Sequence, residues 1–305
     1  MKHHYIPAFY LSRWAVSGRV VEFAKVHGGK VVAKPKAPEA TGFKHRLYEM
    51  KGWEPKLAQQ VEEGYFKPID TMAADALEML YRHGHNAGWT AKSRTAWTRF
   101  VLSLLLRCPE DIDAFREWWH DDFGRTDAEG EERYKKWREP SDPATFSEYL
   151  ISQPLSVKEA YLFTVLNSLL EHDSVGTHIN NMNWRVLETP IAGPRLLTSD
   201  RPVIRSNNLN GEKGHIALPI GPRLLFIASH DLRFLNDLLR TDQTGLVKEC
   251  NRQVVEGAVR FIYASDAKQA RFIQNRFGNQ PQPRLMEQII GRRRSLDGAV
   301  EITDR

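Results

Sequence analysis

The feature that most constrains the fold is a change of hydrophobic periodicity along the chain. Strand-like runs occupy residues 19–34 and much of the chain after residue 183, whereas residues 55–170 repeat their apolar side chains at helical spacing. Strands at both ends of a helical middle are buried most simply by pairing with each other and packing on the helices. We therefore expect an α+β fold, with a mainly antiparallel sheet from both chain ends packed against a central helical block.

Local signals fill in the N-terminal part of this outline. Residues 4–14 predict a short helix after an extended lead, with Pro7 near its start. Residues 19–23 and 30–34 predict a hairpin, because His27-Gly28-Gly29 between them is a turn sequence. Residues 42–49 predict a loop or a short strand.

The helical block is expected over about residues 55–180. Thr90 is a suitable N-cap for a helix that Arg107-Cys108-Pro109 ends or kinks. A polar helix follows over 111–123, and an acidic connection with one short helix over 124–143. The patterns that follow predict helices over 156–170, 231–239, 246–256 and 266–277. They predict strands over 184–188, 195–198, 216–219, 224–228 and 259–264. Residues 3–278 are expected to form a single domain, followed by a polar, basic tail over 279–305.

Composition limits the class of protein. The chain has 305 residues, 41% of them hydrophobic, and its two cysteines, Cys108 and Cys250, form no CxxC pair. This argues against a disulfide scaffold or a thiolate zinc site and favours a reducing cytoplasm. No stretch approaches the roughly 18 apolar residues that a membrane helix needs, and no apolar signal-peptide core follows the N-terminus. We expect a cytoplasmic protein with no membrane partner; its oligomeric state is left open.

Charge is distributed unevenly around a net of +5. Residues 1–51 carry ten Lys and Arg against three Glu, a net of +7, and residues 110–149 carry six Lys and Arg against thirteen Asp and Glu, a net of −7. A basic N-terminal face can attract phosphates, which suggests nucleic acid or a phosphorylated ligand as a partner. The alternative is a solvated surface of mixed charge.

The opening His3-His4-Tyr5-Ile6-Pro7 is the first constellation with chemical potential. Adjacent histidines point in different directions on a regular helix or strand, so one can serve a site. Histidine suits acid–base work or metal ligation, with His4 favoured over His3 because it adjoins an apolar face. The alternative is a capping or packed histidine.

The second constellation is the step Thr198-Ser199-Asp200-Arg201-Pro202-Val203. An acid just beyond a strand can be held rigidly at a site, where Asp200 can orient a histidine, bind a metal or act as a base. The alternative is an Asx-turn. Ser199 and Arg201, like Tyr5, are expected on the substrate side of such a site.

Two further residues come from the last third. Arg223 follows the turn Pro219-Ile220-Gly221-Pro222 and is expected to be mainly structural, with a substrate-binding role as the sharper alternative. Asn251 lies in a helical pattern, where Asn needs exposure or a polar partner; buried, it can orient a site.

Five separated features resemble bacterial domain-of-unknown-function family 4238. The opening His3 to Leu11 is similar to its HHYVPxFYL start, and residues 18–23 to its first strand. The step at 198–203 resembles its T-S-D-N-P-V, with Arg201 where the family usually has Asn, and residues 218–222 resemble its L-P-L-S-P. Cys250-Asn251 matches its late asparagine. The resemblance implies a shared fold and site, and no particular activity.

Two classes of function follow. In the first, His4 or His3, Asp200 and Asn251 share one pocket and catalyse hydrolysis, with nucleic acid or another phosphodiester as substrate and a divalent metal as a possible cofactor. In the second, the protein is a non-catalytic binding or sensor module, and the same polar residues satisfy buried groups, with a structural hydrogen bond between His4 and Asp200.

Overall fold

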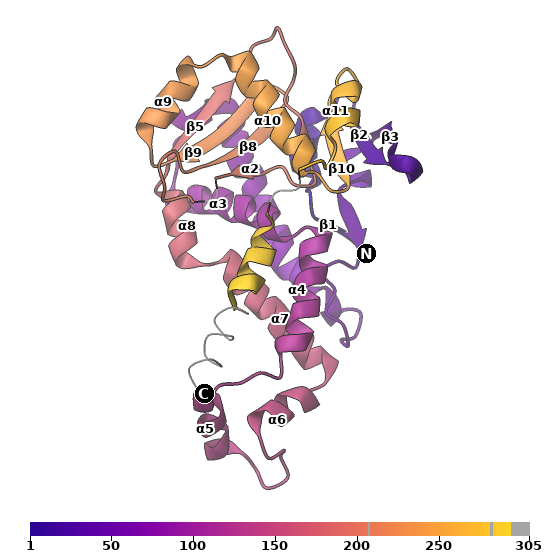
Figure 1. The fold of residues 1–305 in the computed structure, drawn as a ribbon, viewed down its shortest axis with the longest axis vertical. Coiled ribbons are helices and arrows are strands. Elements are labelled where there is room, and N and C mark those ends of the chain that lie inside the picture. Colours follow the sequence, from indigo (N-terminus) through magenta and orange to yellow (C-terminus); the bar gives the residue numbers. More distant parts are fainter. Residues whose placement is uncertain (207, 281–282, 294–305) are drawn as a thin grey trace.

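The computed structural model describes residues 1–206, 208–280 and 283–293. Antiparallel sheets lie at one end of the molecule, and long helices run from them toward the other end (Figure 1). The expected α+β class is confirmed, with strands from both ends of the chain.

Strands from both chain ends form the first four-stranded sheet, in the order β3-β2-β10-β6. Its members are β2 (Val20–Lys25), β3 (Val31–Lys36), β6 (Thr198–Ser199) and β10 (Phe261–Ala264). Phe23 on β2 lies opposite Ile262 on β10, and both are buried. The predicted hairpin is therefore the part of the N-terminus that pairs with the C-terminal third.

The other late strands form a second sheet instead of extending the first. Its order is β5-β9-β8-β7, with β5 (Asn183–Glu188), β7 (Ile204–Arg205), β8 (His215–Gly221) and β9 (Leu224–Ser229), and β1 (Lys2–His4) pairs with β4 (Phe43–His45) in a separate ribbon. Of the strand expected over 195–198, only Thr198 is in β6. Pro202 cannot donate to a ladder, and the chain crosses here to the second sheet. We call residues 200–203 the crossing.

Eleven α-helices of the described residues precede the C-terminal segment, and those over 146–152 and 173–180 were not predicted individually. The eleven are α1 (Ala8–Leu11), α2 (Lys67–His83), α3 (Ala91–Leu106), α4 (Pro109–Asp122), α5 (Ala128–Trp137), α6 (Phe146–Ser152), α7 (Leu155–Leu170), α8 (Asp173–Asn180), α9 (Leu232–Arg240), α10 (Gln243–Gly257) and α11 (Ala270–Arg276). Thr90 caps α3, because its hydroxyl accepts from the Ser93 N–H at 3.1 Å. None of the helices described has the length and apolar character needed to cross a membrane.

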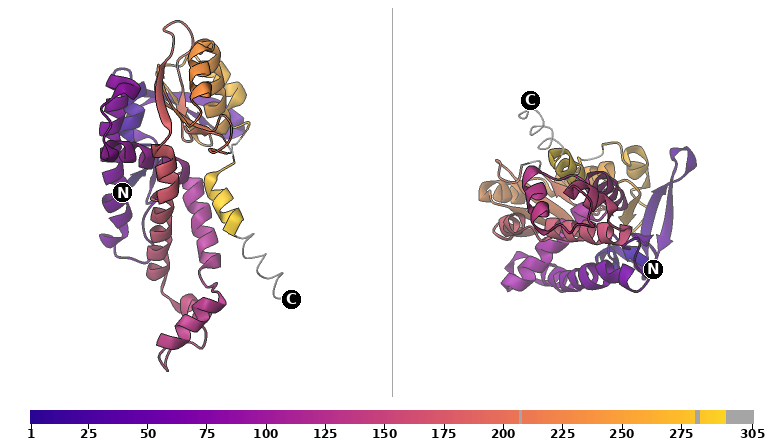
Figure 2. Two further views of the ribbon diagram at one scale, coloured as in Figure 1. Left: turned by 90° about the vertical axis from the view of Figure 1, so that its left-hand side faces the viewer. Right: turned by 90° about the horizontal axis from the view of Figure 1, so that it is seen from below.

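Helices α4 and α7 run side by side away from the sheets and lead to a hairpin of α5 and α6 (Figures 1 and 2). The hairpin has aromatic contacts of its own. Tyr134 on α5 stacks on Phe146 of α6 with ring centroids 5.3 Å apart, and Trp137 packs on Tyr149 at 5.4 Å. The expected short helix in this connection is thus stabilised by the element that follows it.

The N-terminal segment is fixed to the last third of the chain by buried hydrogen bonds. The Tyr10 hydroxyl donates to the Pro219 carbonyl at 2.6 Å and lies 2.8 Å from Thr198 Oγ1. Trp14 is fully buried, and its Nε1–H donates to the Leu196 carbonyl at 2.8 Å. The largest apolar core includes these side chains together with residues of α2, α3, α7 and β8. A single cooperative domain over 3–278 stays a prediction that this continuous core supports.

The C-terminal segment, residues 283–293, differs from the expected polar tail. Residues 285–293 are helical, Met286 is fully buried and Ile290 is 8% exposed in the largest core. Apolar side chains at positions 285, 286, 289 and 290 form one helical stripe, which the nearby basic residues obscured at the level of composition. The remainder of the expected tail, from residue 294, lies outside the described residues.

Two of the tryptophans that donate to backbone carbonyls, one buried and one exposed, give a matched test of this arrangement. Replacing Trp14 by Phe leaves the Leu196 carbonyl buried without its donor, and we expect a loss of about 2–4 kcal/mol in unfolding free energy, measured in urea. Trp53 is 37% exposed and its Nε1–H donates to the Ser156 carbonyl at 2.7 Å. Trp53→Phe is the control, and water can replace its bond, so its loss should stay below about 1 kcal/mol. Equal losses of unfolding free energy for the two variants would contradict a stabilising role of the buried Trp14–Leu196 hydrogen bond.

Candidate functional site

The N-terminal motif reaches the crossing through a tight backbone contact. The N–H groups of Tyr5 and Ile6 both donate to the Gly42 carbonyl, at 2.9 and 3.1 Å. Gly42 has φ +66°, and a Cβ there would lie 2.7 Å from the Ile6 carbonyl oxygen. Only glycine fits this position without strain. The contact with Gly42 holds the backbone of Tyr5, whose buried side chain lies near Asp200 and Cys108. Burial and both neighbours raise the pKa of Tyr5.

Asp200 stands at the first position of the crossing and is 1% exposed. Its carboxylate accepts from the backbone N–H groups of Val259, at 3.0 Å, and Arg260, just before β10. Its carbonyl accepts from Cys108 Sγ at 2.9 Å. Burial raises the pKa of Asp200 to about 6, while the two N–H donors and Arg201 act in the opposite direction. This acid therefore joins β6 to β10.

Charged side chains surround the crossing from the start of α4. Arg201 Nη1 lies 2.9 Å from Asp111 Oδ2, and Arg201 Nη2 lies 3.7 Å from Glu110 Oε2. Arg260 also pairs with Glu110, and Arg284 Nη1 is 3.6 Å from Asp111 Oδ1. Asp111 is fully buried, and burial raises its pKa against the effect of the arginines. We call these residues, with Tyr5, Cys108 and Asp200, the buried charge cluster.

Several donors in the buried charge cluster lack an acceptor. The Tyr5 hydroxyl and Arg201 Nε and Nη2 are buried and make no hydrogen bond with the described residues. The neighbouring carboxylate oxygens Glu110 Oε2 and Asp111 Oδ1 and Oδ2 also make none, and they face the arginines as ion pairs only. Burial, followed by the charge of Asp200, raises the pKa of Tyr5, so its hydroxyl remains a donor at neutral pH. A buried donor without an acceptor costs about 1–3 kcal/mol. The arrangement can bind a group that supplies acceptor oxygens.

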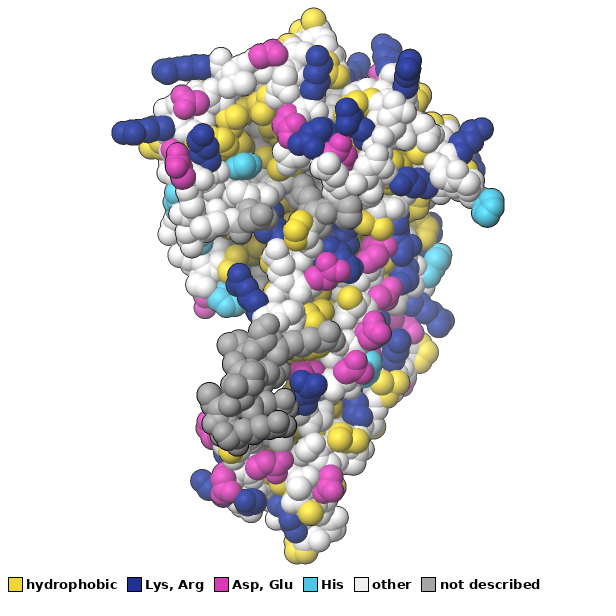
Figure 3. All heavy atoms as spheres, in the orientation of Figure 1, with side chains coloured by type: hydrophobic (Ala, Val, Ile, Leu, Met, Phe, Trp, Pro, Cys, Tyr) yellow, Lys and Arg dark blue, Asp and Glu magenta, His cyan; other side chains and the backbone are white. Residues whose placement is uncertain are grey.

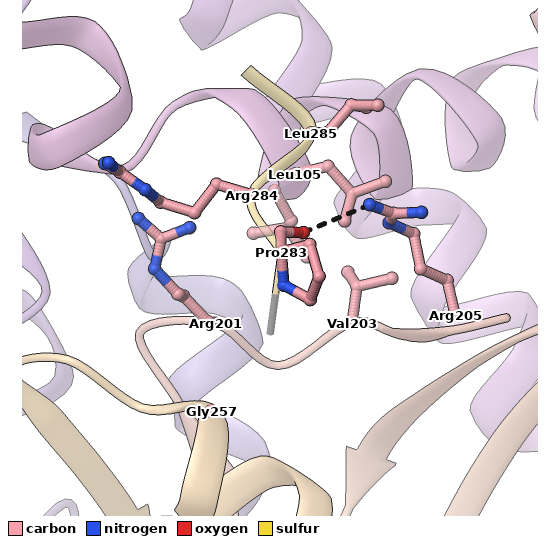
Figure 4. Close-up of a pocket in the computed structure, with 9 residues that line it drawn as sticks. Leu105, Arg201, Val203, Arg205, Gly257, Pro283, Arg284 and Leu285 are labelled. Carbon is pink, nitrogen blue, oxygen red and sulfur yellow. Dashed lines mark hydrogen bonds between the residues drawn. The ribbon is translucent and has the colours of Figure 1, made fainter. Parts of the chain in front are cut away.

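A small cavity lies on one side of the cluster. Its volume is about 30 Å³, and it is lined by the crossing and β7 (Arg201, Val203, Arg205), by Leu104, Leu105 and Gly257, and by Pro283, Arg284 and Leu285 of the C-terminal segment. Figure 4 shows Pro283 between the side chains of Arg201 and Arg205. This is room for about one water molecule.

The two histidines of the opening motif have separate surroundings. His3 is fully buried: its Nδ1 accepts from the Tyr48 N–H at 2.9 Å and its Nε2 lies 2.7 Å from Gln59 Oε1. His4 packs edge-on against Phe43, and burial lowers its pKa. The charged groups that act on His4 are Lys2, Glu39 and Arg107, and Asp200 is not among them. The expected His4–Asp200 hydrogen bond is not among the contacts of the described residues; Asp200 binds backbone N–H groups instead.

Asn251 also belongs to a different place. Its Oδ1 accepts from the Leu197 N–H at 2.8 Å, and its Nδ2 donates to the Arg195 carbonyl at 2.8 Å and to Gln269 Oε1 at 3.1 Å. These bonds hold the residues 195–197 that lead into β6. Asn251 is thus a buried Asn with polar partners, as expected.

The remaining predicted residues have local roles. Ser199 Oγ accepts from the Arg201 N–H at 3.1 Å, a turn contact within the step. Arg223 donates to the carbonyls of Pro190, at 2.6 Å, and Ile191, at 2.8 Å, and so holds the loop before residue 195. Among the predicted site residues, the structure brings together Tyr5, Asp200, Arg201 and, at its edge, Ser199.

The side chains that complete the cluster were not predicted as site residues. Cys108, Glu110 and Asp111 come from the α3–α4 junction, which the sequence marked only as a helix end. The available signal was an unusual junction, in which a long apolar helix runs into two acids just after a proline. In the parts of the chain that the structure describes, no group of three or more His, Cys, Asp or Glu side chains is arranged to hold a metal ion.

A family model described as a protein of unknown function, DUF4238, matches residues 2–268. The chain belongs to the DUF4238 family. Comparisons with curated proteins and with solved structures gave no match. The DUF4238 match includes the opening motif, the α3–α4 junction and the crossing, and it ends before the C-terminal segment. The part of the cavity wall made by Pro283, Arg284 and Leu285 therefore lies outside the matched region.

Two further acids, the buried Glu62 and the half-buried Asp70, flank Arg107, the residue before Cys108. Arg107 is fully buried, and its Nη1 donates to Asp70 Oδ1 at 2.9 Å. Glu62 is 6% exposed in the π-helical turn Glu62–Phe66, and its Oε2 has no hydrogen-bond partner among the described residues. Burial, then the nearby Asp70, raises the pKa of Glu62 to about 7 against the effect of Arg107. The folded state therefore favours a protonated Glu62.

Phenylalanine variants of Tyr5 and Tyr10 test whether the Tyr5 hydroxyl in the buried charge cluster lacks a hydrogen-bond partner. Tyr5→Phe removes a hydroxyl that has no partner, so the unfolding free energy should stay within about 0.5 kcal/mol of wild type or rise. Tyr10→Phe removes the buried bond to the Pro219 carbonyl and should cost about 1–3 kcal/mol. Urea unfolding of both variants provides the comparison. A loss for Tyr5→Phe as large as for Tyr10→Phe would show that its hydroxyl is already satisfied.

Glu62 gives a pH test. Its folded pKa lies above its unfolded value, so the folded state binds the extra proton and stability falls as pH rises from about 4.5 to about 7. Glu62→Gln should remove this fall, which amounts to about 2–3 kcal/mol. Urea midpoints at pH 5 and pH 8 measure it. The exposed neighbour Glu63 supplies the control, since Glu63→Gln should keep the wild-type pH dependence.

Proposed function

We propose that this chain is a non-catalytic binding or sensor protein whose ligand contacts the buried charge cluster. One observation carries the proposal: the Tyr5 hydroxyl and two Arg201 nitrogens are buried donors without acceptors, and they lie where the opening motif, the α3–α4 junction and the crossing meet. Buried polar groups are nearly always paired, and a bound water or ion is one explanation of an exception. A ligand with acceptor oxygens would pair these donors.

The geometry favours binding over hydrolysis. A catalytic carboxylate needs free lone pairs or a histidine to orient, and the Asp200 carboxylate is occupied by the N–H groups of Val259 and Arg260. The partners of His4 and Asn251 are elsewhere. Hydrolysis of nucleic acid or another phosphodiester, with or without a divalent metal, stays a prediction without geometric support.

Surface charge gives no separate indication of a nucleic-acid interface. On the face seen in Figure 3, Lys and Arg side chains are interspersed with Asp and Glu. Both cysteines are buried free thiols, which fits the proposed cytoplasmic location of a bacterial protein.

Thermal melting in the presence of single compounds tests the proposal. Inorganic phosphate, nucleoside diphosphates, amino acids and Mg²⁺ are added one at a time to wild type and to Arg201→Gln. A ligand present at 100 times its Kd should stabilise the folded chain by about 2.7 kcal/mol. We expect an oxygen-rich compound to raise the Tm of wild type, and Arg201→Gln to lose this shift.

Arg233→Gln provides the matched control, because Arg233 is exposed on α9 and should keep the shift. The same samples are incubated with RNA and DNA oligonucleotides. Cleavage by wild type that His4→Ala and Asp200→Asn abolish would overturn the proposal in favour of hydrolysis. No shift with any compound would also count against it.

A further inference from the structure

The C-terminal segment supplies the outer wall of the cavity beside the buried charge cluster. Pro283 lies between Arg201 and Arg205 (Figure 4). Arg284 Nη1 lies 3.6 Å from Asp111 Oδ1. Met286 and Ile290 hold the segment in the largest core. A second hollow of about 430 Å³ lies on its other side, between Arg284, Glu287 and Ile290 and the α4 side chains Ala114, Glu117 and Trp118. The segment is thus bounded by hollows on two sides and is held by few buried side chains.

Arg205 shows what the segment does to this site. Its guanidinium donates to the Pro283 carbonyl at 3.2 Å and to Gln288 Oε1 at 3.1 Å, and both partners belong to the segment. Both are neutral. Among the ion pairs of the described residues Arg205 has no acidic partner, and burial lowers its pKa accordingly. A phosphate would add opposite charge and a bidentate geometry that neutral carbonyl oxygens do not offer a guanidinium.

Arg201 presents matching unused donors across Pro283. Asp111 lies 2.9 Å from its Nη1, whereas its Nε and Nη2 have no hydrogen-bond partner. Asp111 thus fixes the orientation of Arg201, and Glu110 Oε2 lies 3.7 Å from its Nη2, beyond hydrogen-bond distance, so Nε and Nη2 can still donate to another acceptor. Two guanidinium groups with unsatisfied or weakly satisfied donors form a fork that suits a tetrahedral anion.

The volume of the cavity shows whether a ligand could bind beside the C-terminal segment or would have to displace it. The cavity of about 30 Å³ holds about one water molecule, so no phosphate group fits while Pro283 is in place. Without the segment, the floor would consist of Leu104, Val203 and Gly257, flanked by Arg201 and Arg205. The family match ends at residue 268, so the floor and both arginines belong to the matched part and the segment does not.

We propose that Arg201 and Arg205 bind a phosphate-bearing ligand in the place that Pro283 occupies, and that the C-terminal segment competes with this ligand. The inference rests on the proposed binding function and adds the ligand class and the competitor. With the segment in place, Arg205 donates to two neutral acceptors of the segment, and Arg284 of the segment forms an ion pair with Asp111. A phosphate replaces the neutral acceptors with charged ones, and the segment leaves.

Isothermal titration calorimetry of the full chain with pyrophosphate and with inorganic phosphate tests the competition. Met286→Asp places a charge in the buried contact and should release the segment, so we expect the Kd for pyrophosphate to fall at least tenfold relative to wild type. Adding Arg205→Gln to this variant should raise the Kd again at least tenfold. Arg292→Ala changes an exposed residue of the same helix and should bind as wild type does.

A second variant and a second measurement guard against misfolding. Gln288→Leu removes one acceptor of Arg205 without touching the buried stripe, and it should lower the Kd in the same direction. Hydrogen exchange of wild type should become faster over residues 285–293 when pyrophosphate is added. Exchange that is unchanged or slower at saturating pyrophosphate would overturn the competition.

The possible failures are distinguishable. Equal Kd values for wild type, Met286→Asp and Gln288→Leu would show that the segment does not compete, and would leave the binding function intact. No binding of either phosphate by any folded variant would overturn the ligand class, while a melting shift with another oxygen-rich compound would still support the proposed function.

Discussion

The fold depends on how one buried carboxylate satisfies the backbone at a seam between two sheets. Asp200 accepts from the N–H groups of Val259 and Arg260, and its own carbonyl accepts from Cys108. These bonds join the end of β6 to the start of β10 and to the α3–α4 junction. Burial makes ionisation of this acid costly, and the two backbone donors offset part of that cost. The opening motif, the helices and both sheets therefore meet at one position.

Hydrophobic periodicity predicted most helices and strands, because the buried face of each requires apolar residues at regular spacing. The hairpin that contains Phe23, the helix capped by Thr90 and the strands β8 and β9 all follow local patterns that the structure confirms. Local patterns did not predict the division into two four-stranded sheets. This division depends on the crossing at Pro202 and on which strands pair on either side of it. Long-range pairing of this kind leaves little local signal.

The candidate site was predicted in part for the same reason. Tyr5, Asp200 and Arg201 stood out as polar residues at element ends, and the structure brings them together. His4 and Asn251 stood out by residue type alone, and their partners lie elsewhere. Glu110 and Asp111 stood only at the start of a predicted polar helix, because sequence cannot tell which turn of a charged helix faces a neighbour.

The hairpin of α5 and α6 has a consequence for how such a chain can diversify. It is connected to the body through α4 and α7, and its aromatic side chains pack on one another (Figure 1). Residues at its turn therefore contribute little to the seam at Asp200. Loop lengthening costs little free energy when the ends of the loop stay in place. Evolution, or a protein engineer inserting a fluorescent reporter, can alter this tip while the rest of the molecule keeps its shape.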